Sequence, residues 1–294
     1  MTGISVPGFE VSAGVARLRE FADAIGETRP LYLDEAAARQ AGYRSLPLPP
    51  TFLFGLGLEA GEPFPWFAEV GFDLPRVLHA EQAFIYHRPA CAGETLTVQA
   101  RTTDVFERHG GILRFAVRET RISDAAGLPV ADLRSVFVQP EASPPARPRA
   151  AEIADQDDAA LRLPPIARDT LERFAIASGD LNPLHRDPAF ARGAGLDDVI
   201  AQGMLAMAWL ARRLTQLVPQ SSLRQFSARF LGITRLGEAP VCRGHALPDA
   251  GDGLQRFALR VDGADGEARL RGEALSTACA SAPDPLPPAG EGTC

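Results

Sequence analysis

Residues 174–206 read FAIASGDLNPLHRDPAFARGAGLDDVIAQGMLA, and they bring a carboxylate, an amide and an imidazole together within six positions. These side chains belong to Asp180, Asn182 and His185. Pro183 stands among them, and a proline inside a helix removes a hydrogen bond and clashes with the preceding turn. The stretch therefore predicts a structured loop whose polar side chains converge on one point.

An apolar run follows this loop and predicts a buried helix from Gly203 to about residue 217, before Pro219. Gly203 is expected at the start of the helix, where backbone N–H groups have no partner within the helix. The positive end of the helix dipole adds to these groups, so the Gly203 N–H is a candidate donor to a developing oxyanion. An acid–base pair followed by an oxyanion site suits the addition or removal of water beside a carbonyl.

Residues 21–53 repeat this stretch at an offset of 153. Without gaps, 12 of the 33 aligned positions are identical, whereas chance would give roughly two or three. The chain is therefore predicted to be a tandem duplication. The polar centre has diverged, because Glu27, Arg29 and Tyr32 stand where the second copy has its carboxylate, amide and imidazole. Pro49-Pro50 replaces Gln202-Gly203 and has no N–H to donate, so we expect no active site in the first half.

Each copy is followed by a helix and a run of strands. The first-half helix, which begins near Thr51, is expected to stop early because Pro63 and Pro65 follow it. Strands are predicted at 77–88, 95–107, 112–123 and 129–138, and again at 223–233, 239–247, 254–262 and 267–277. This order predicts an α+β fold with two antiparallel sheets, each wrapped around its own helix. The two sheets are expected to pair edge to edge, since that removes two exposed edges.

The predicted domains are 1–140 and 163–279. A proline-rich and acidic segment, 141–162, is interpreted as a linker, and residues 280–294 as a disordered tail.

Composition indicates a globular protein of 294 residues with a net charge of −7, which argues against a general nucleic-acid binder. No stretch reaches the roughly 20 apolar residues of a membrane span, and the N-terminal residues lack the pattern of a secretory signal. Four scattered cysteines without metal-binding spacing favour a reducing cytoplasm over structural disulfides. No lysine occurs, which excludes Schiff-base chemistry.

The motifs ASGDLNPLH and IAQGM resemble the signature of MaoC-type dehydratases and (R)-specific enoyl-CoA hydratases, which have the hotdog fold. FADAIGETRPLY, PPTF and HAEQAFIYHRP resemble the non-catalytic N-terminal domain of two-hotdog members. The resemblance covers nearly the whole chain outside the linker and tail. It implies a tandem hotdog that reversibly hydrates trans-2-enoyl thioesters of CoA or acyl carrier protein.

The resemblance also implies roles for single residues. Asp180 and His185 are the expected catalytic pair, which would hold a water molecule so that one takes its proton while the other protonates C2. Asn182 is expected to orient them, although capping the following turn is an alternative. Gly203 is expected to donate its N–H to the thioester oxygen. No metal or redox cofactor is expected, and Arg229 and Arg235 are candidate contacts for the CoA phosphates.

Several alternatives stay open. The short first-half helix would leave room for an acyl tail, or the first half would simply complete the sheet. The substrate could be a branched or dicarboxylic enoyl-CoA of the mesaconyl type. Thioester hydrolysis and a non-catalytic acyl-thioester-binding subunit are further alternatives, and the quaternary state, a homodimer included, is undetermined.

Overall fold

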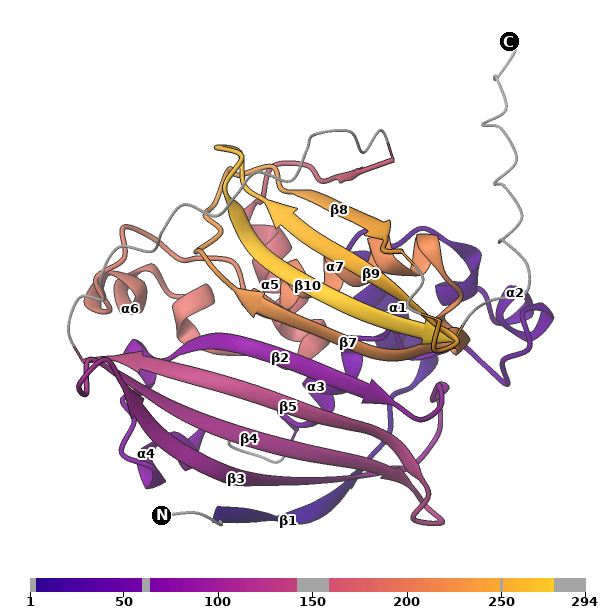
Figure 1. Ribbon diagram of the computed structural model, residues 1–294, viewed down its shortest axis with the longest axis horizontal. Coiled ribbons are helices and arrows are strands. Elements are labelled where there is room, and N and C mark those ends of the chain that lie inside the picture. Colours follow the sequence, from indigo (N-terminus) through magenta and orange to yellow (C-terminus); the bar gives the residue numbers. More distant parts are fainter. Residues whose placement is uncertain (1–3, 60–63, 142–158, 249–250, 278–294) are drawn as a thin grey trace.

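The computed structural model describes residues 4–59, 64–141, 159–248 and 251–277. Ten strands form one continuous antiparallel sheet in the order β1-β3-β4-β5-β2-β7-β10-β9-β8-β6 (Figure 1). The strands are β1 (Ile4–Val11), β2 (Leu78–Tyr86), β3 (Leu96–Arg108), β4 (Leu113–Asp124), β5 (Pro129–Pro140), β6 (Leu161–Arg162), β7 (Leu223–Phe230), β8 (Val241–Ala246), β9 (Leu254–Asp262) and β10 (Ala268–Thr277).

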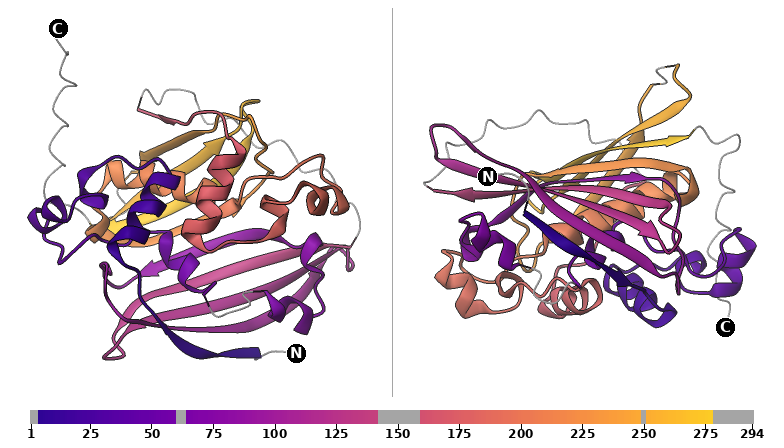
Figure 2. Two further views of the ribbon diagram at one scale, coloured as in Figure 1. Left: turned by 180° about the vertical axis from the view of Figure 1, so that it is seen from behind. Right: turned by 90° about the horizontal axis from the view of Figure 1, so that it is seen from below.

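The helices lie together on one face of this sheet (Figure 2). The α-helices are α1 (Val15–Ala24), α2 (Glu35–Gln40), α3 (Phe52–Leu56), α4 (Pro65–Glu69), α5 (Arg168–Ser178), α6 (Pro188–Gly193) and α7 (Gly203–Leu217). Short 3₁₀ turns are η1 (Pro30–Tyr32), η2 (Leu74–Arg76), η3 (Pro183–His185) and η4 (Gln220–Ser222).

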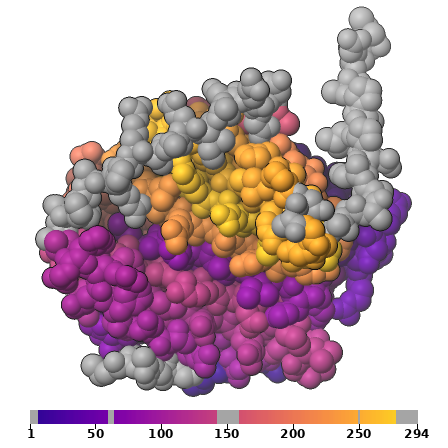
Figure 3. All heavy atoms as spheres, in the orientation of Figure 1, coloured from indigo at the N-terminus to yellow at the C-terminus, as the bar shows by residue number. Residues whose placement is uncertain are grey.

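The two halves join at a seam between β2 and β7. Gln82 lies opposite Ala228 and Phe84 opposite Phe226, so the seam is a regular antiparallel ladder. From the seam outward, each half continues through four further strands in the same relative order. The expected edge-to-edge pairing and the tandem α+β hotdog are therefore confirmed, with the two expected sheets fused into one. Figure 3 shows the two halves fitting closely together across this face.

The repeat seen in the sequence is also a repeat of structure. Elements η1 and α2 recur 153 residues later as η3 and α6. Asp34 and Asp187 cap the equivalent helices, each accepting a backbone N–H at 2.7 Å. Phe21 and Phe174, at matching positions of α1 and α5, pack together in the fully buried core with ring centroids 5.6 Å apart.

The helices after the repeats differ in length as predicted. Helix α7 runs for 15 residues, and it is buried almost all round because nearly every residue is apolar. Helix α3 has only five residues, and Pro65 begins the separate helix α4. Close packing against α5 also matters, because a Cβ on Gly55 of α3 would meet the Ser178 carbonyl oxygen at 2.3 Å.

Two strands were not predicted. β1 at the edge of the first half contains Pro7 and Gly8, and its register shifts between Val6 and Phe9, so no alternating pattern announces it. β6 falls within the segment expected to be a linker and pairs with β8. The rest of that linker, 142–158, and the expected tail lie outside the described residues.

Candidate active site

The loop after α5 is shaped by its own short polar side chains. Gly179 ends the helix in a left-handed conformation with φ 79°, which a residue with a side chain rarely adopts. The Ser178 hydroxyl accepts the Asp180 N–H at 3.2 Å, and Asn182 Oδ1 accepts the Leu184 N–H at 3.0 Å. Asn182 thereby caps the turn η3 that carries His185.

His185 is held in one tautomer by its backbone partner. Its Nδ1 lies 2.9 Å from the carbonyl oxygen of Ile200, which can only accept a hydrogen bond. Nδ1 of the neutral ring therefore carries the hydrogen, and Nε2 keeps a free lone pair. The imidazole is thus prepared to accept a proton at Nε2.

Helix α7 begins at Gly203, as predicted, beside this loop. Gln202 is its N-cap residue and is fully buried, and its Nε2 donates to the Leu171 carbonyl at 3.1 Å. A Cβ on Gly203 would lie 3.1 Å from two ring carbons of Phe230, so glycine allows the helix start to pack against β7. The first N–H groups of a long helix are thereby presented beside Asp180 and His185.

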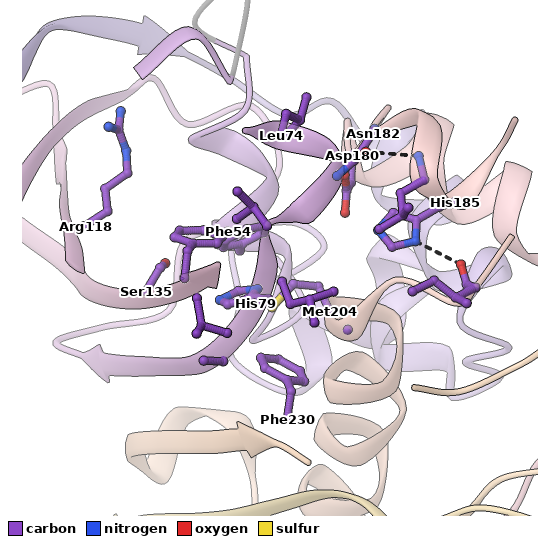
Figure 4. A pocket seen from close by; sticks show the side chains of 18 of the residues that line it. Phe54, Leu74, His79, Arg118, Ser135, Asp180, Asn182, His185, Met204 and Phe230 are labelled. Atoms are coloured by element: carbon purple, nitrogen blue, oxygen red, sulfur yellow. Dashed lines mark hydrogen bonds between the residues drawn. The ribbon is translucent and has the colours of Figure 1, made fainter. Parts of the chain in front are cut away.

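A cavity of about 820 Å³ joins these groups. Its second-half lining includes Asp180, Asn182, Leu184, His185, Gly203, Met204 and Phe230. Its first-half lining includes Phe54, Trp66, Leu74, His79, Arg118, Thr120 and Ser135. In Figure 4, Asp180 and His185 lie on one side of the cavity and Arg118 and Ser135 on the other. The cavity is therefore built jointly by both halves, and the shortness of α3 leaves the first-half part of it open.

His79, the first residue of the stretch HAEQAFIYHRP, also lines the cavity. Its ring lies among Phe54, Phe137 and Phe230, with centroids 5.4, 4.7 and 4.8 Å away. Burial lowers the pKa of His79 to about 4, so the ring is neutral near pH 7. Its Nε2 is buried without a hydrogen-bond partner among the described residues. His79 opens the motif HAEQAFIYHRP, which implied no site residue, and Arg118 lies outside the motifs, so only an inward position on a strand could have signalled them.

The candidate phosphate contacts are placed differently. Arg229 lies on β7 next to Phe230, so its side chain points to the opposite face of the sheet, where its Nε lies 3.0 Å from Glu81. The structure does not bring Arg229 to the cavity. Arg235 is exposed and follows Thr234, which does line the cavity. A phosphate-binding role remains a prediction for both residues.

The equivalent position in the first half is filled. Arg29 binds Glu27 through its Nε at 3.0 Å and donates to the carbonyl and hydroxyl of Thr215, near the C-terminal end of α7. The Tyr32 hydroxyl donates to Gln220 at 2.7 Å. The space lined by Glu27, Tyr32 and Thr215 measures about 10 Å³. Three changed side chains have thus converted the loop into an internal brace.

In the part of the chain that the structure describes, no group of three or more His, Cys, Asp or Glu residues could hold a metal ion. Within the same ranges, no helix combines the length and apolarity needed to cross a membrane. Cys91 and Cys242, the cysteines that fall among the described residues, are free and buried.

Comparison with family models divides the chain into two matches. A model described as "FAS1-like, dehydratase domain region" matches residues 1–133, and a "MaoC like domain" model matches residues 149–244. The "UPF0336 protein" of Saccharopolyspora erythraea is 36% identical over 132 residues, which cover 45% of this chain and 82% of that protein.

Solved structures show the same fold over nearly the full length. A MaoC-like dehydratase from Phytophthora capsici superimposes with a TM-score of 0.74 at 21% identity, covering 95% of this chain and 97% of that chain. A conserved hypothetical protein from Mycobacterium tuberculosis with a double hotdog fold gives a TM-score of 0.66 at 14% identity, covering 94% and 96%.

Proposed function

We propose that this chain reversibly hydrates trans-2-enoyl thioesters to (R)-3-hydroxyacyl thioesters. The chain belongs to the MaoC-like dehydratases in their two-hotdog form and is related to the UPF0336 proteins. One observation carries the proposal. Asp180, His185 and the start of α7 at Gly203 line one cavity large enough for an acyl chain. Hydration needs this combination, because a proton must move while negative charge develops on the thioester oxygen.

His185 acts through Nε2. Its Nδ1 hydrogen is engaged by Ile200, so Nε2 takes a proton from the water as the water oxygen attacks C3. Asp180 accepts a hydrogen bond from the other water hydrogen, which stays on the oxygen as the product hydroxyl, and stabilises the imidazolium that forms. The imidazolium then returns its proton to C2, so one water molecule is added and no proton is gained or lost.

The Gly203 N–H stabilises the enolate oxygen formed between these steps. One such donor contributes about 3 kcal/mol in other enzymes, and the dipole of the 15-residue helix α7 adds to it. Asn182 holds the turn of His185 through its cap on Leu184 and in this way orients the pair.

The first half receives the acyl tail. Its part of the cavity is lined largely by apolar and aromatic side chains such as Phe54, Trp66 and Leu133. This lining favours substrates whose acyl chain is longer than the four-carbon crotonyl unit. It also argues against the alternative in which the first half only completes the sheet. Either CoA or acyl carrier protein would leave the acyl part in this position, and a cytoplasmic location stays a prediction.

Two other functions fit less well. Thioester hydrolysis in this fold would draw on a carboxylate along the central helix, and α7 contains no acidic residue. A purely binding subunit has no use for a histidine whose tautomer is fixed and whose Nε2 is left free.

The test follows the loss of enoyl thioester absorbance with trans-2-enoyl-CoAs of four to twelve carbons. We expect turnover that rises with chain length, and chiral analysis of the product should give the (R)-3-hydroxyacyl-CoA. Absence of turnover with every CoA and acyl-carrier-protein thioester in the series would overturn the proposal. Release of free CoA would indicate hydrolysis in its place.

A further inference from the structure

The inner face of the first-half sheet carries a row of polar residues where a hydrophobic core would be expected. The row crosses four neighbouring strands in register, because Arg118 lies opposite Thr102 on one side and Ser135 on the other, and Ser135 lies opposite Gln82. Thr102 and Gln82 are fully buried, and Arg118 and Ser135 line the cavity. Through Arg118 and Ser135, the polar row thus forms part of the wall of the first-half part of the cavity, which we call the acyl chamber.

The fold does not require polar residues there. The second half repeats the first at an offset of 144 in this region, so the row equivalent to Gln82 begins at Phe226. It continues in register through Ala274, Phe257 and Ala246, all of which are apolar. The polar row therefore belongs to the chamber and not to the architecture of the sheet.

Within the row, Arg118 is the charged member that lines the cavity, and part of its guanidinium has no hydrogen-bond partner among the described residues. Ser135 and Gln82 satisfy each other, with the hydroxyl donating to Oε1 at 2.6 Å. The guanidinium of Arg118 stacks over the ring of Trp66, with its carbon 4.6 Å from the ring centroid. Its Nη1 is buried without a hydrogen-bond partner among the described residues. A buried donor that makes no hydrogen bond costs free energy, and an acceptor bound to it would recover that free energy.

The charge of Arg118 is also incompletely balanced. Burial lowers the pKa of Arg118 to about 10, and the exposed Glu69 on α4 offsets this only in part. The guanidinium nevertheless stays protonated near neutral pH. A planar cation that is stacked on an aromatic ring, in a side chain that lines the cavity, matches a carboxylate, which a guanidinium can bind through two parallel hydrogen bonds.

We propose that Arg118 binds a carboxylate at the far end of the acyl chain, so that the preferred substrates are enoyl thioesters of dicarboxylic acids. This inference rests on the proposed hydratase function and names the substrate class of the same site. It makes Arg118 a specificity-determining residue, since the guanidinium is remote from Asp180 and His185 (Figure 4).

The position of β4 sets the required length. Three strand spacings separate β4 from β7, which packs against Gly203, and at about 4.8 Å each they amount to roughly 14 Å. A four-carbon dicarboxylic unit of the mesaconyl type would not span this distance. Chains of medium length with a terminal carboxylate would reach Arg118.

The experiment compares two series of trans-2-enoyl-CoAs, from six to twelve carbons, which end either in a methyl group or in a carboxylate. At the best length, wild-type kcat/KM should favour the carboxylate by roughly ten- to a hundredfold, as expected for a buried charge-assisted hydrogen bond. Arg118→Met should abolish or reverse this preference, mainly through KM. Arg118→Lys should retain part of it.

Two controls separate binding from folding. Melting curves, together with turnover of four-carbon crotonyl-CoA, which does not reach Arg118, report whether Arg118→Met is folded. Arg121→Met removes an exposed arginine of the same strand, which faces Asp132, and should leave the preference intact. Turnover of methyl-ended chains without any carboxylate preference, or equal losses of both series in Arg118→Met, would overturn this inference and leave the hydratase standing. Absence of all turnover would overturn the hydratase itself.

Discussion

Two loops of the same origin contact the two ends of helix α7. One of them lines an open cavity, and the other fills the equivalent space. At the N-terminal end, Asp180 and His185 line a cavity of about 820 Å³. At the C-terminal end, Glu27 and Tyr32 line a space of only about 10 Å³. The backbone of the two loops is nearly the same, since η1 and α2 recur as η3 and α6. The difference therefore arises from a few side chains and from the polarity of the helix.

Helix polarity explains which end can support the reaction. The start of α7 presents N–H groups and positive potential, which stabilise an oxyanion. Its end presents carbonyl groups and negative potential, and Arg29 donates there to the Thr215 carbonyl. A cation suits this end and an enolate does not. An active loop and a structural brace are thus two uses of one scaffold.

The largest effect should come from the open end. Asp180→Asn and His185→Ala should each lower kcat by about 10³, which is within the usual range for a lost acid–base group. Stopped-flow measurement of enoyl absorbance would give these rates, with melting curves to check folding. Glu27→Gln is the matched change at the closed end and should leave turnover per folded molecule unaltered. Equal losses of kcat from the changes in both loops would show that the two loops do not differ in function.

The closed end should show its effect in stability. Glu27→Gln should lower the free energy of unfolding by about 3 kcal/mol, because it leaves the Arg29 guanidinium without its buried partner. Urea denaturation followed by circular dichroism measures the change. Glu35→Gln, which affects the exposed pair with Arg39, should cost less than about 0.5 kcal/mol. A similar small cost for Glu27 would show that the brace is not structural.

Filling the first-half chamber should separate long chains from short ones. Thr120 lies on β4 and lines the cavity, so Thr120→Phe should lower kcat/KM for long enoyl chains by roughly tenfold. Four-carbon chains should be unaffected, and Thr120→Val should behave as wild type. Unchanged long-chain turnover in Thr120→Phe would mean that the tail leaves by another route.

A smaller effect concerns pH. Burial alone would raise the pKa of Glu27, but the hydrogen bond and charge of Arg29 outweigh it and hold the pKa below its ordinary value of 4.5. A carboxyl with a lowered folded pKa stabilises fully above its unfolded pKa and loses this contribution as pH falls through its folded pKa. The stability difference between wild type and Glu27→Gln should therefore shrink between about pH 5 and pH 3. A difference that is constant over this range would contradict the assigned ionisation.

The sequence predicted features that repeat or that involve proline and glycine. The duplication, the start of α7 at Gly203 and the early end of α3 were all readable, because Pro63, Pro65 and Pro183 restrict the backbone locally. Eight strands were located by alternating β-branched and aromatic residues. The strand β1 was missed because Pro7 and Gly8 interrupt that alternation.

Single residues on the inner face of the sheet were harder to interpret. Arg118 lies outside the motifs and His79 lies in one that implied no active site, so the meaning of both residues depends on which strands the sheet places side by side. Arg118 acquires its neighbours Thr102 and Ser135 only through register, which the sequence does not state. Conversely, Arg229 was a candidate contact for the CoA phosphates, and alternation along β7 turns it to the face opposite the cavity-lining Phe230.

The seam between β2 and β7 also bears on how activity depends on dilution. In an assembly of two separate hotdog chains, a cavity lined by both would be lost whenever the partners dissociate. Here the two halves are covalently tethered, so each remains at a high effective concentration relative to the other at any protein concentration. One chain therefore carries the complete cavity, and its turnover per molecule should stay constant however dilute the protein becomes.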